Sequence, residues 1–305
     1  MRLPEDIARD LTKRGELWDA VPGVSGMRGT LARLRREVST AIAGLASCFT
    51  DDEWTMPRTI AFETLESASY FESFPQWLSG ASHLSGDESV LERVATSMSP
   101  ADTARESFLP VKAALPPAVC YHTYAALRGQ SIVSPLIMTA EETCWRHENG
   151  RLAKLERGWA FTMREIICLG DPNTAEMFRK SGMEEAVILA ESLGLTVRVE
   201  IATDPFFAPS ARGKAILQRV KALKHELLID YPDGRSLAIA SFNNHELFFG
   251  NAFDISLPDG NPATSACVAF GIERWVLAVL MTHGLDDQDW PDTLTCSSAI
   301  AGIAS

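Results

Sequence analysis

The second half of the chain is a succession of short strand-like runs, and this pattern most constrains the fold. From about residue 115 to residue 250, apolar runs rich in β-branched and aromatic residues alternate with turn residues. The runs are PAVCYHTYAAL, IVSPLIMTAEETCWRHE, GWAFTMREIICL, LTVRVEIAT, HELLIDYP and RSLAIASFNNHELFFG. Strands joined as hairpins, with helices on one face, predict an α+β antiparallel sheet flanked by helices, and not a repeated βαβ unit.

Two long helices are expected among these strands. The first has Asp171 as its N-cap, Pro172 in its first turn and Gly194 at its end. The second, TSACVAFGIERWVLAVLMTHG, is apolar along most of its length and ends at Gly284. Both segments are long enough to cover one face of the predicted sheet.

The part of the chain before the sheet is expected to be helical and mixed. Residues 1–47 have apolar side chains at helical spacing, and one short helix is expected to start near Ser85 or Gly86. We therefore predict an N-terminal helical and mixed region over residues 1–110, packed on a sheet domain over residues 111–305.

Charge and hydropathy exclude several classes of partner. The chain has 40 acidic and 28 basic residues, a formal net charge of -12, whereas extensive nucleic-acid binding needs a basic surface. No apolar run is free enough of charge to span a bilayer, and the start MRLPEDIARDL lacks the apolar core of a secretion signal. The sequence predicts a cytoplasmic protein without a membrane partner.

One strand-like run carries two charges where a buried strand should be apolar. WAFTMREIICLG has Arg164 and Glu165 at its centre. Because side chains alternate along a strand, Phe161, Met163 and Glu165 share one face and Arg164 takes the other. A buried charge needs a partner, so Glu165 needs an arginine or a bound cation nearby.

The segment TCWRHENGRLAKLERGWAFTMREI is predicted to be a long hairpin around a basic loop. Arg146 and Glu148 lie two residues apart and so share a face of the first strand. An arginine can bind phosphate, a carboxylate can accept a hydrogen bond from the adenine amine, and a ring such as Phe161 can stack on the base. The hairpin therefore predicts a nucleotide site.

These segments resemble two motifs of class II aminoacyl-tRNA synthetases. CWRHE with FTMRE is similar to motif 2, and AFGIERWVLAVL is similar to motif 3, whose arginine opens a buried helix. The pattern resembles the seryl-type catalytic domain of the zinc-dependent archaeal kind, and the truncated bacterial amino acid:[carrier protein] ligases that share it. The resemblance covers about residues 110–285 and implies a class II catalytic domain, a homodimer and ATP-dependent activation of an amino acid.

The resemblance also implies a metal site. In zinc-dependent members a cysteine, a glutamate and a second cysteine hold the ion, and the matching residues are Cys120, Glu165 and Cys267. Two thiolates and one carboxylate leave one tetrahedral position of zinc open, where the amine of a substrate can bind. Glu165 thereby serves substrate binding too, and the cation neutralises its charge. The alternative is that both cysteines are inert core residues and Glu165 pairs with an arginine.

Further positions match nucleotide-binding and substrate-binding residues of the same enzymes. The ATP positions are Arg146, Glu148, Arg157, Phe161, Ala238, Ser241 and Arg274, and Asn244 follows at a substrate position. Arg146 and Arg274 are implied to act catalytically on the α-phosphate and γ-phosphate. Arg157 either touches the outer phosphates or is a solvated loop residue. The resemblance places Ala238 where the family has a glutamate that helps to hold Mg²⁺ with ATP, so it does not identify the magnesium ligands of this chain.

A basic segment suggests the acceptor. FFAPSARGKAILQRVKALKH, residues 206–225, has five basic residues and no acidic one. A helix near residues 210–225 is expected to dock an acidic acyl or peptidyl carrier protein, although a solvated helix face is the alternative. The docking residues are Arg212, Lys214, Arg219, Lys221 and Lys224. tRNA is not expected as acceptor, because no long coiled coil precedes the catalytic region.

Together these features predict an amino acid:[carrier protein] ligase. With Zn²⁺, and with Mg²⁺ bound to ATP, it would convert glycine or alanine to an aminoacyl-adenylate and pass the aminoacyl group to a phosphopantetheine thiol. The alternatives are a truncated seryl-type tRNA synthetase and an inactive paralogue that binds zinc or ATP as a regulator.

Overall fold

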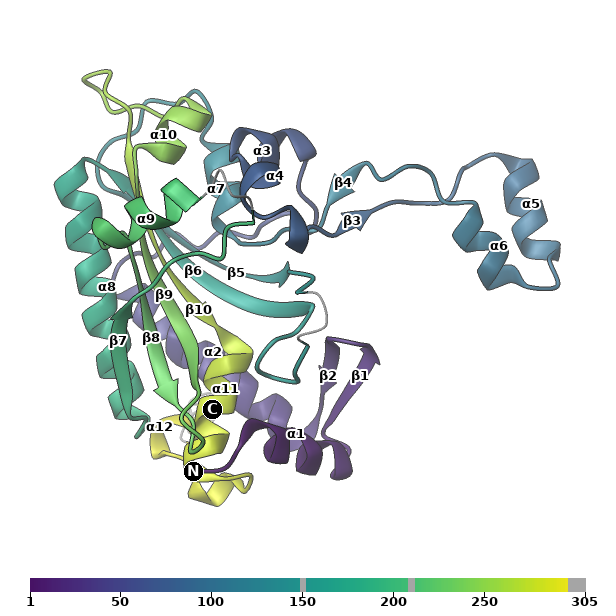
Figure 1. The fold of residues 1–305 in the computed structure, drawn as a ribbon, viewed down its shortest axis with the longest axis horizontal. Coiled ribbons are helices and arrows are strands. Elements are labelled where there is room, and N and C mark those ends of the chain that lie inside the picture. The colour runs from purple at the N-terminus through teal and green to yellow at the C-terminus, as the bar shows by residue number, and fades with distance from the viewer. Residues whose placement is uncertain (149–151, 208–211, 296–305) are drawn as a thin grey trace, which may run out of the picture.

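A six-stranded antiparallel sheet forms the centre of the molecule (Figure 1). The computed structural model describes residues 1–148, 152–207 and 212–295. In sheet order the strands are β5 Leu136–Trp145, β6 Ala160–Gly170, β10 Thr264–Gly271, β9 Ser236–Glu246, β8 Lys224–Asp230 and β7 Val197–Ile201. Every neighbouring pair is antiparallel, so the predicted α+β fold class is confirmed.

Helices cover one face of this sheet and enclose the main core with it. They are α1 Pro4–Lys13, α2 Gly29–Ser47, α8 Pro172–Ser192, α11 Ile272–His283 and α12 Asp292–Thr295. In α2 the buried residues Leu31, Leu34, Val38 and Ile42 are spaced three or four positions apart, as an amphipathic helix requires. The core joins these side chains to the strands and to α11, so the N-terminal helices pack on the sheet.

The predicted ends of α8 are confirmed. The carboxylate of Asp171 accepts hydrogen bonds from the backbone N–H groups of Asn173 and Thr174, and Pro172 opens the helix. At the other end Gly194 has φ +70°, the left-handed conformation that lets the chain leave a helix.

Short helices lie on the opposite face of the sheet. They are α3 Phe62–Ser67, α4 Tyr70–Ser73, the 3-10 helix Pro75–Trp77, α7 Cys120–Ala126 and α10 Phe248–Phe253. Tyr124 of α7 stacks on Phe249 of α10, with ring centroids 4.0 Å apart. A second core forms there and includes Cys120 and Cys267.

An arm projects from the body (Figure 1). The short strands β3 Gly80–Ala81 and β4 Ala113–Ala114 pair as a ribbon and lead to α5 Glu88–Thr96 and α6 Pro100–Glu106. Neither helix has a buried residue. The polar stretch thus forms two helices where one was predicted, and the first is capped by Asp87.

Three predicted elements are wrong. Residues 1–47 are interrupted by a hairpin of β1 Leu17–Val21 and β2 Val24–Met27, which turns at Gly23 with φ +78°. The run PAVCYHTYAAL forms α7 and not a strand, because its buried residues Cys120, Thr123, Tyr124 and Leu127 have helical spacing.

The third correction concerns the second long helix, of which only the last part is helical. Residues 264–271 form β10, whose residues are buried on both faces. Strands covered on both sides do not alternate in hydropathy, so periodicity cannot distinguish them from a buried helix. Within the described residues, no helix is long and apolar enough to cross a membrane.

Candidate active site

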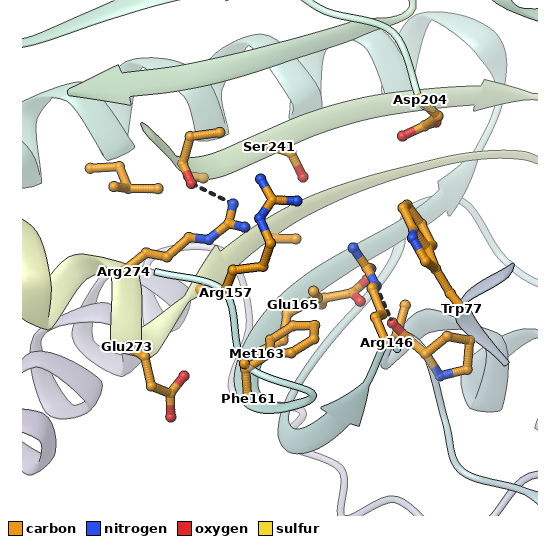
Figure 2. A pocket seen from close by; sticks show the side chains of 18 of the residues that line it. Trp77, Arg146, Arg157, Phe161, Met163, Glu165, Asp204, Ser241, Glu273 and Arg274 are labelled. Carbon is orange, nitrogen blue, oxygen red and sulfur yellow. Dashed lines mark hydrogen bonds between the residues drawn. The ribbon is translucent and has the colours of Figure 1, made fainter. Parts of the chain in front are cut away.

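A pocket opens on the face of the sheet opposite α8 and α11 (Figure 2). Ten residues predicted to bind nucleotide, substrate or metal line it: Cys120, Arg146, Glu148, Arg157, Phe161, Glu165, Ala238, Ser241, Cys267 and Arg274. They come from α7, from the hairpin of β5 and β6, and from β9, β10 and α11. The hairpin and the motif-3 segment are therefore brought together, although more than a hundred residues separate them.

Two cysteines and a glutamate form a buried cluster at one end of the pocket. The ligand atoms of Cys120, Glu165 and Cys267 all lie within 4.8 Å of one another. Cys267 and Glu165 share a face of the sheet, because Glu165 pairs with Ala269, two residues along β10. Cys120 approaches from the first turn of α7.

The cluster fits a metal ion. Glu165 Oε1 accepts a hydrogen bond of 2.8 Å from the backbone N–H of Val119, whereas Oε2 is buried and has no partner among the described residues. An orphaned buried carboxylate oxygen is costly unless a cation satisfies it. Burial raises the pKa of Glu165 to about 7, and the neighbouring Cys267 contributes to this rise.

The two thiols differ in their tendency to ionise. A hydrogen bond from Cys120 lowers the pKa of Cys267, and the same bond raises the pKa of the Cys120 thiol that donates it. His245 Nε2 lies 3.4 Å and Asn243 Nδ2 lies 3.5 Å from the Cys267 sulfur, and both favour its thiolate. Two sulfur donors and one carboxylate donor match the preference of Zn²⁺. A bound zinc ion would displace the proton that lies between the Cys120 and Cys267 sulfurs.

Arg146 is held between two aromatic rings at the mouth of the hairpin (Figure 2). Its guanidinium carbon lies 5.1 Å from the Trp77 ring centroid and 5.4 Å from that of Phe161, and Nε donates to the Pro117 carbonyl at 2.8 Å. Burial would lower the pKa of Arg146, but the neighbouring Cys144 and tyrosines raise it overall. The cation is therefore positioned before any ligand binds.

Arg274 enters the same pocket from the first turn of α11. Its Nε donates to the Glu156 carbonyl at 2.8 Å and its Nη1 to the Ala238 carbonyl at 2.9 Å. Burial lowers the pKa of Arg274, and the charge of Arg157 adds to this effect. Arg157 itself forms an ion pair with Glu148.

The structure does not bring Asn244 to the pocket. Its Nδ2 donates to Glu176 Oε2 of α8 at 3.1 Å, on the opposite face of the sheet. Asn243 and His245 line the pocket instead. Strand alternation starting from Ser241 would have identified these two residues, since they lie two and four positions further along β9.

The basic segment differs from its prediction. The helix α9 covers Arg212–Val220, so Lys221 and Lys224 lie beyond it. Lys224 opens β8 and is buried, with Nζ 2.6 Å from Asp204 and 3.1 Å from Glu226, so it cannot dock a partner. Lys221 is exposed and pairs with Glu246 at 2.8 Å, and Arg219 is exposed. The side chains of Arg212 and Lys214 lie outside the described part.

Replacing Lys224 with methionine is expected to lower the free energy of unfolding by about 2 kcal/mol, because it leaves the half-buried Asp204 carboxylate without its cation. The exposed neighbour provides the control, since K221M should change stability by less than about 1 kcal/mol. Denaturant unfolding of both variants measures the difference. Equal stability of K224M and wild type would show that Lys224 has no structural role.

Comparison with known proteins identifies related chains. No protein-family model matches the sequence. Amino acid--[acyl-carrier-protein] ligase 1 of Bradyrhizobium diazoefficiens is 36% identical over 238 residues, which are 77% of this chain and 72% of that protein. Ligase 2 of the same organism is 36% identical over 230 residues, 74% of this chain and 68% of that protein.

More distant matches are seryl enzymes. The type-2 serine--tRNA ligase of Methanopyrus kandleri is 27% identical over 195 residues, 59% of this chain and 36% of that protein. A crystal structure of A. aeolicus tRNASec in complex with M. kandleri SerRS matches the fold with a TM-score of 0.86 at 20% identity. That match covers all of this chain but only 62% of the other chain. The coverage and identity of the bacterial relatives are decisive: the chain belongs to the amino acid--[acyl-carrier-protein] ligase family.

Proposed function

We propose that the protein activates a small amino acid with ATP and transfers it to the phosphopantetheine thiol of a carrier protein. The observation that carries the proposal is the pocket that the Cys120, Glu165 and Cys267 donors share with two half-buried arginines, Arg146 and Arg274. The names of the bacterial relatives support the acceptor class.

The chain's own side chains position both substrates. A zinc ion held by the Cys120, Glu165 and Cys267 donors would supply a Lewis-acidic position for the substrate amine. Phe161 stacks on adenine, and Arg146 binds the α-phosphate. The substrate carboxylate attacks the α-phosphorus, pyrophosphate leaves, and an aminoacyl-adenylate forms. Arg146 and Arg274 stabilise the charge that develops on the phosphate oxygens.

Glu148 and Arg157 exchange partners when ATP binds. In the structure they form an ion pair at the pocket wall. The outer phosphates are stronger partners for Arg157, and Glu148 is then free to accept a hydrogen bond from the adenine amine. In the second step the carrier thiol loses its proton to solvent, its sulfur attacks the aminoacyl carbonyl, and AMP leaves with the electron pair of the broken C–O bond.

The surroundings of the cluster favour glycine or alanine. Asn243 and His245 contact the sulfur of Cys267 from β9. The His245 and Phe249 rings lie 4.9 Å apart, and the Tyr121 and Phe249 rings lie 5.9 Å apart, so aromatic groups crowd this end of the pocket. A larger substrate side chain would have to displace them.

The surface of α9 supports carrier docking. Ile216, Leu217 and Val220 are 64%, 49% and 77% exposed, and the exposed Arg219 lies among them. An apolar stripe beside an exposed arginine complements an acidic helical partner. The proposal includes a homodimer, as class II folds usually pair, and excludes tRNA as acceptor.

An acceptor assay tests the proposal. Radiolabelled glycine and alanine are offered with ATP to holo-carrier protein and to tRNA, and amino-acid-dependent ATP–pyrophosphate exchange is followed separately. We expect exchange, and label on the holo-carrier alone. Label on tRNA would favour a truncated seryl-type tRNA synthetase, whereas a lack of exchange would favour an inactive paralogue.

A charge reversal on α9 should weaken carrier transfer without affecting activation. R219E is expected to raise the KM for holo-carrier by about tenfold, because it places a carboxylate against an acidic partner. Pyrophosphate exchange needs no carrier and should keep its wild-type rate. R198E, on the exposed edge strand β7, is the control. An unchanged carrier KM for R219E would remove α9 from the docking surface.

A further inference from the structure

Ala238 leaves the ATP site without an expected carboxylate. An alanine methyl group cannot bind a cation, and Mg²⁺ in nucleotide sites uses one or two carboxylates together with phosphate oxygens. Ala238 does line the pocket, and its carbonyl accepts a hydrogen bond of 2.9 Å from Arg274, the residue proposed for the γ-phosphate. A cation bound to the ATP phosphates near this point of β9 would therefore need a carboxylate from another position.

The neighbouring strand places a carboxylate there. Glu226 of β8 pairs in register with Ser241 of β9, and both residues line the pocket. Paired residues on adjacent antiparallel strands have their side chains on the same face, about 5 Å apart at Cβ. The register shifts just beyond this pair, between Leu227 and Leu228, so Ala238 also reaches the pocket wall.

Glu226 carries charge that its own partner does not balance. Lys224 Nζ lies closer to Asp204, at 2.6 Å, than to Glu226, at 3.1 Å, so one ammonium group serves two carboxylates. Gln218 Nε2 donates a hydrogen bond of 2.8 Å to Asp204 as well, which holds this carboxylate beside the lysine. Figure 2 shows Asp204 beside the pocket, on the same side as Ser241.

The negative charge of Glu226 acts on Arg274, the arginine proposed to bind the γ-phosphate. Burial lowers the pKa of Arg274, and Glu226 is one of the carboxylates that oppose this effect. A divalent ion between Glu226 and the phosphates would balance the carboxylate and leave Arg274 to the γ-phosphate.

We propose that Glu226 and the Ser241 hydroxyl bind the Mg²⁺ of Mg·ATP, and that Glu226 replaces the carboxylate absent at position 238. Mg²⁺ retains several waters, so one glutamate, one hydroxyl and the phosphate oxygens complete its shell. The inference rests on the proposed function, since it requires ATP in this pocket.

Isothermal titration calorimetry of ATP, with Mg²⁺ and with EDTA, tests the inference without turnover. E226Q should weaken Mg·ATP binding by about tenfold and leave binding in EDTA unchanged, because only the metal contact is lost. E200Q is the control with the same change in charge. Glu200 lies directly opposite Glu226 in the register of β7 and β8, but its side chain is exposed and forms an ion pair with Arg198.

Two further variants separate metal binding from a structural role as partner of Lys224. S241A keeps that ion pair and should also weaken binding only when Mg²⁺ is present. E226Q/A238E restores a carboxylate on β9 and should recover most of the loss. Wild-type affinity of E226Q for Mg·ATP, or an equal loss with and without Mg²⁺, would overturn the inference. Failure of the wild-type protein to bind ATP at all would overturn the proposed function with it.

Discussion

Replacing Cys267 with alanine is expected to remove the bound zinc and to lower amino-acid-dependent pyrophosphate exchange by about a thousandfold or more, since the metal contribution to positioning amounts to several kcal/mol. Cys267 is 3% exposed and the replacement removes one sulfur, so the fold should persist. Exchange assays with glycine and alanine, together with elemental analysis of the same preparation, measure both effects.

Cys168 provides the matched control for this variant. It is buried in the main core and pairs in register with Ala266, so it lies on the face of the sheet opposite Cys267. C168A should keep zinc and exchange activity, with a loss of stability alone. C267A protein that exchanges pyrophosphate at the wild-type rate would contradict the role of the cluster.

Replacing Arg146 with alanine is expected to lower kcat/KM for exchange by about a thousandfold, mostly in kcat, because the arginine stabilises charge that develops in the transition state. R146K should recover only part of the loss. A lysine keeps the charge but cannot stack between Trp77 and Phe161 or bind phosphate in a bidentate manner.

R198A serves as the arginine control, since Arg198 is paired with Asp230 at 2.9 Å on the exposed edge of the sheet. Its exchange kinetics should match those of the wild type. If R146A changed only the KM for ATP and left kcat intact, Arg146 would be a binding residue without a part in catalysis.

The sequence predicted correctly those parts of the site that follow from the alternation of side chains along a strand. The hairpin of β5 and β6 could be anticipated because alternation along a strand places Phe161, Met163 and Glu165 on one face. The same rule places Ser241 and Asn243 together, yet the prediction used Asn244, which follows family spacing and faces α8. The register of the strand, and not the spacing of motifs, decides which side chain enters a pocket.

Other features depend on contacts that no local pattern records. Lys224 belongs to a basic run in the sequence, but it becomes a buried residue because Asp204 and Glu226 meet it at the start of β8. Strand β10 was predicted as helix because it is buried on both faces. The direction of the arm, with α5 and α6 at its end, depends on the β3–β4 ribbon, whose strands of two residues each are too short to predict.

Cobalt substitution tests the central claim most directly, since it reports both the metal ligands and the access of the substrate amine. Metal-free protein reconstituted with Co²⁺ should show intense thiolate-to-cobalt charge-transfer absorption, and adding glycine or alanine should shift the cobalt spectrum as the amine enters the open position. Protein that binds no cobalt through thiolates, or whose cobalt spectrum does not respond to either amino acid, would contradict the account.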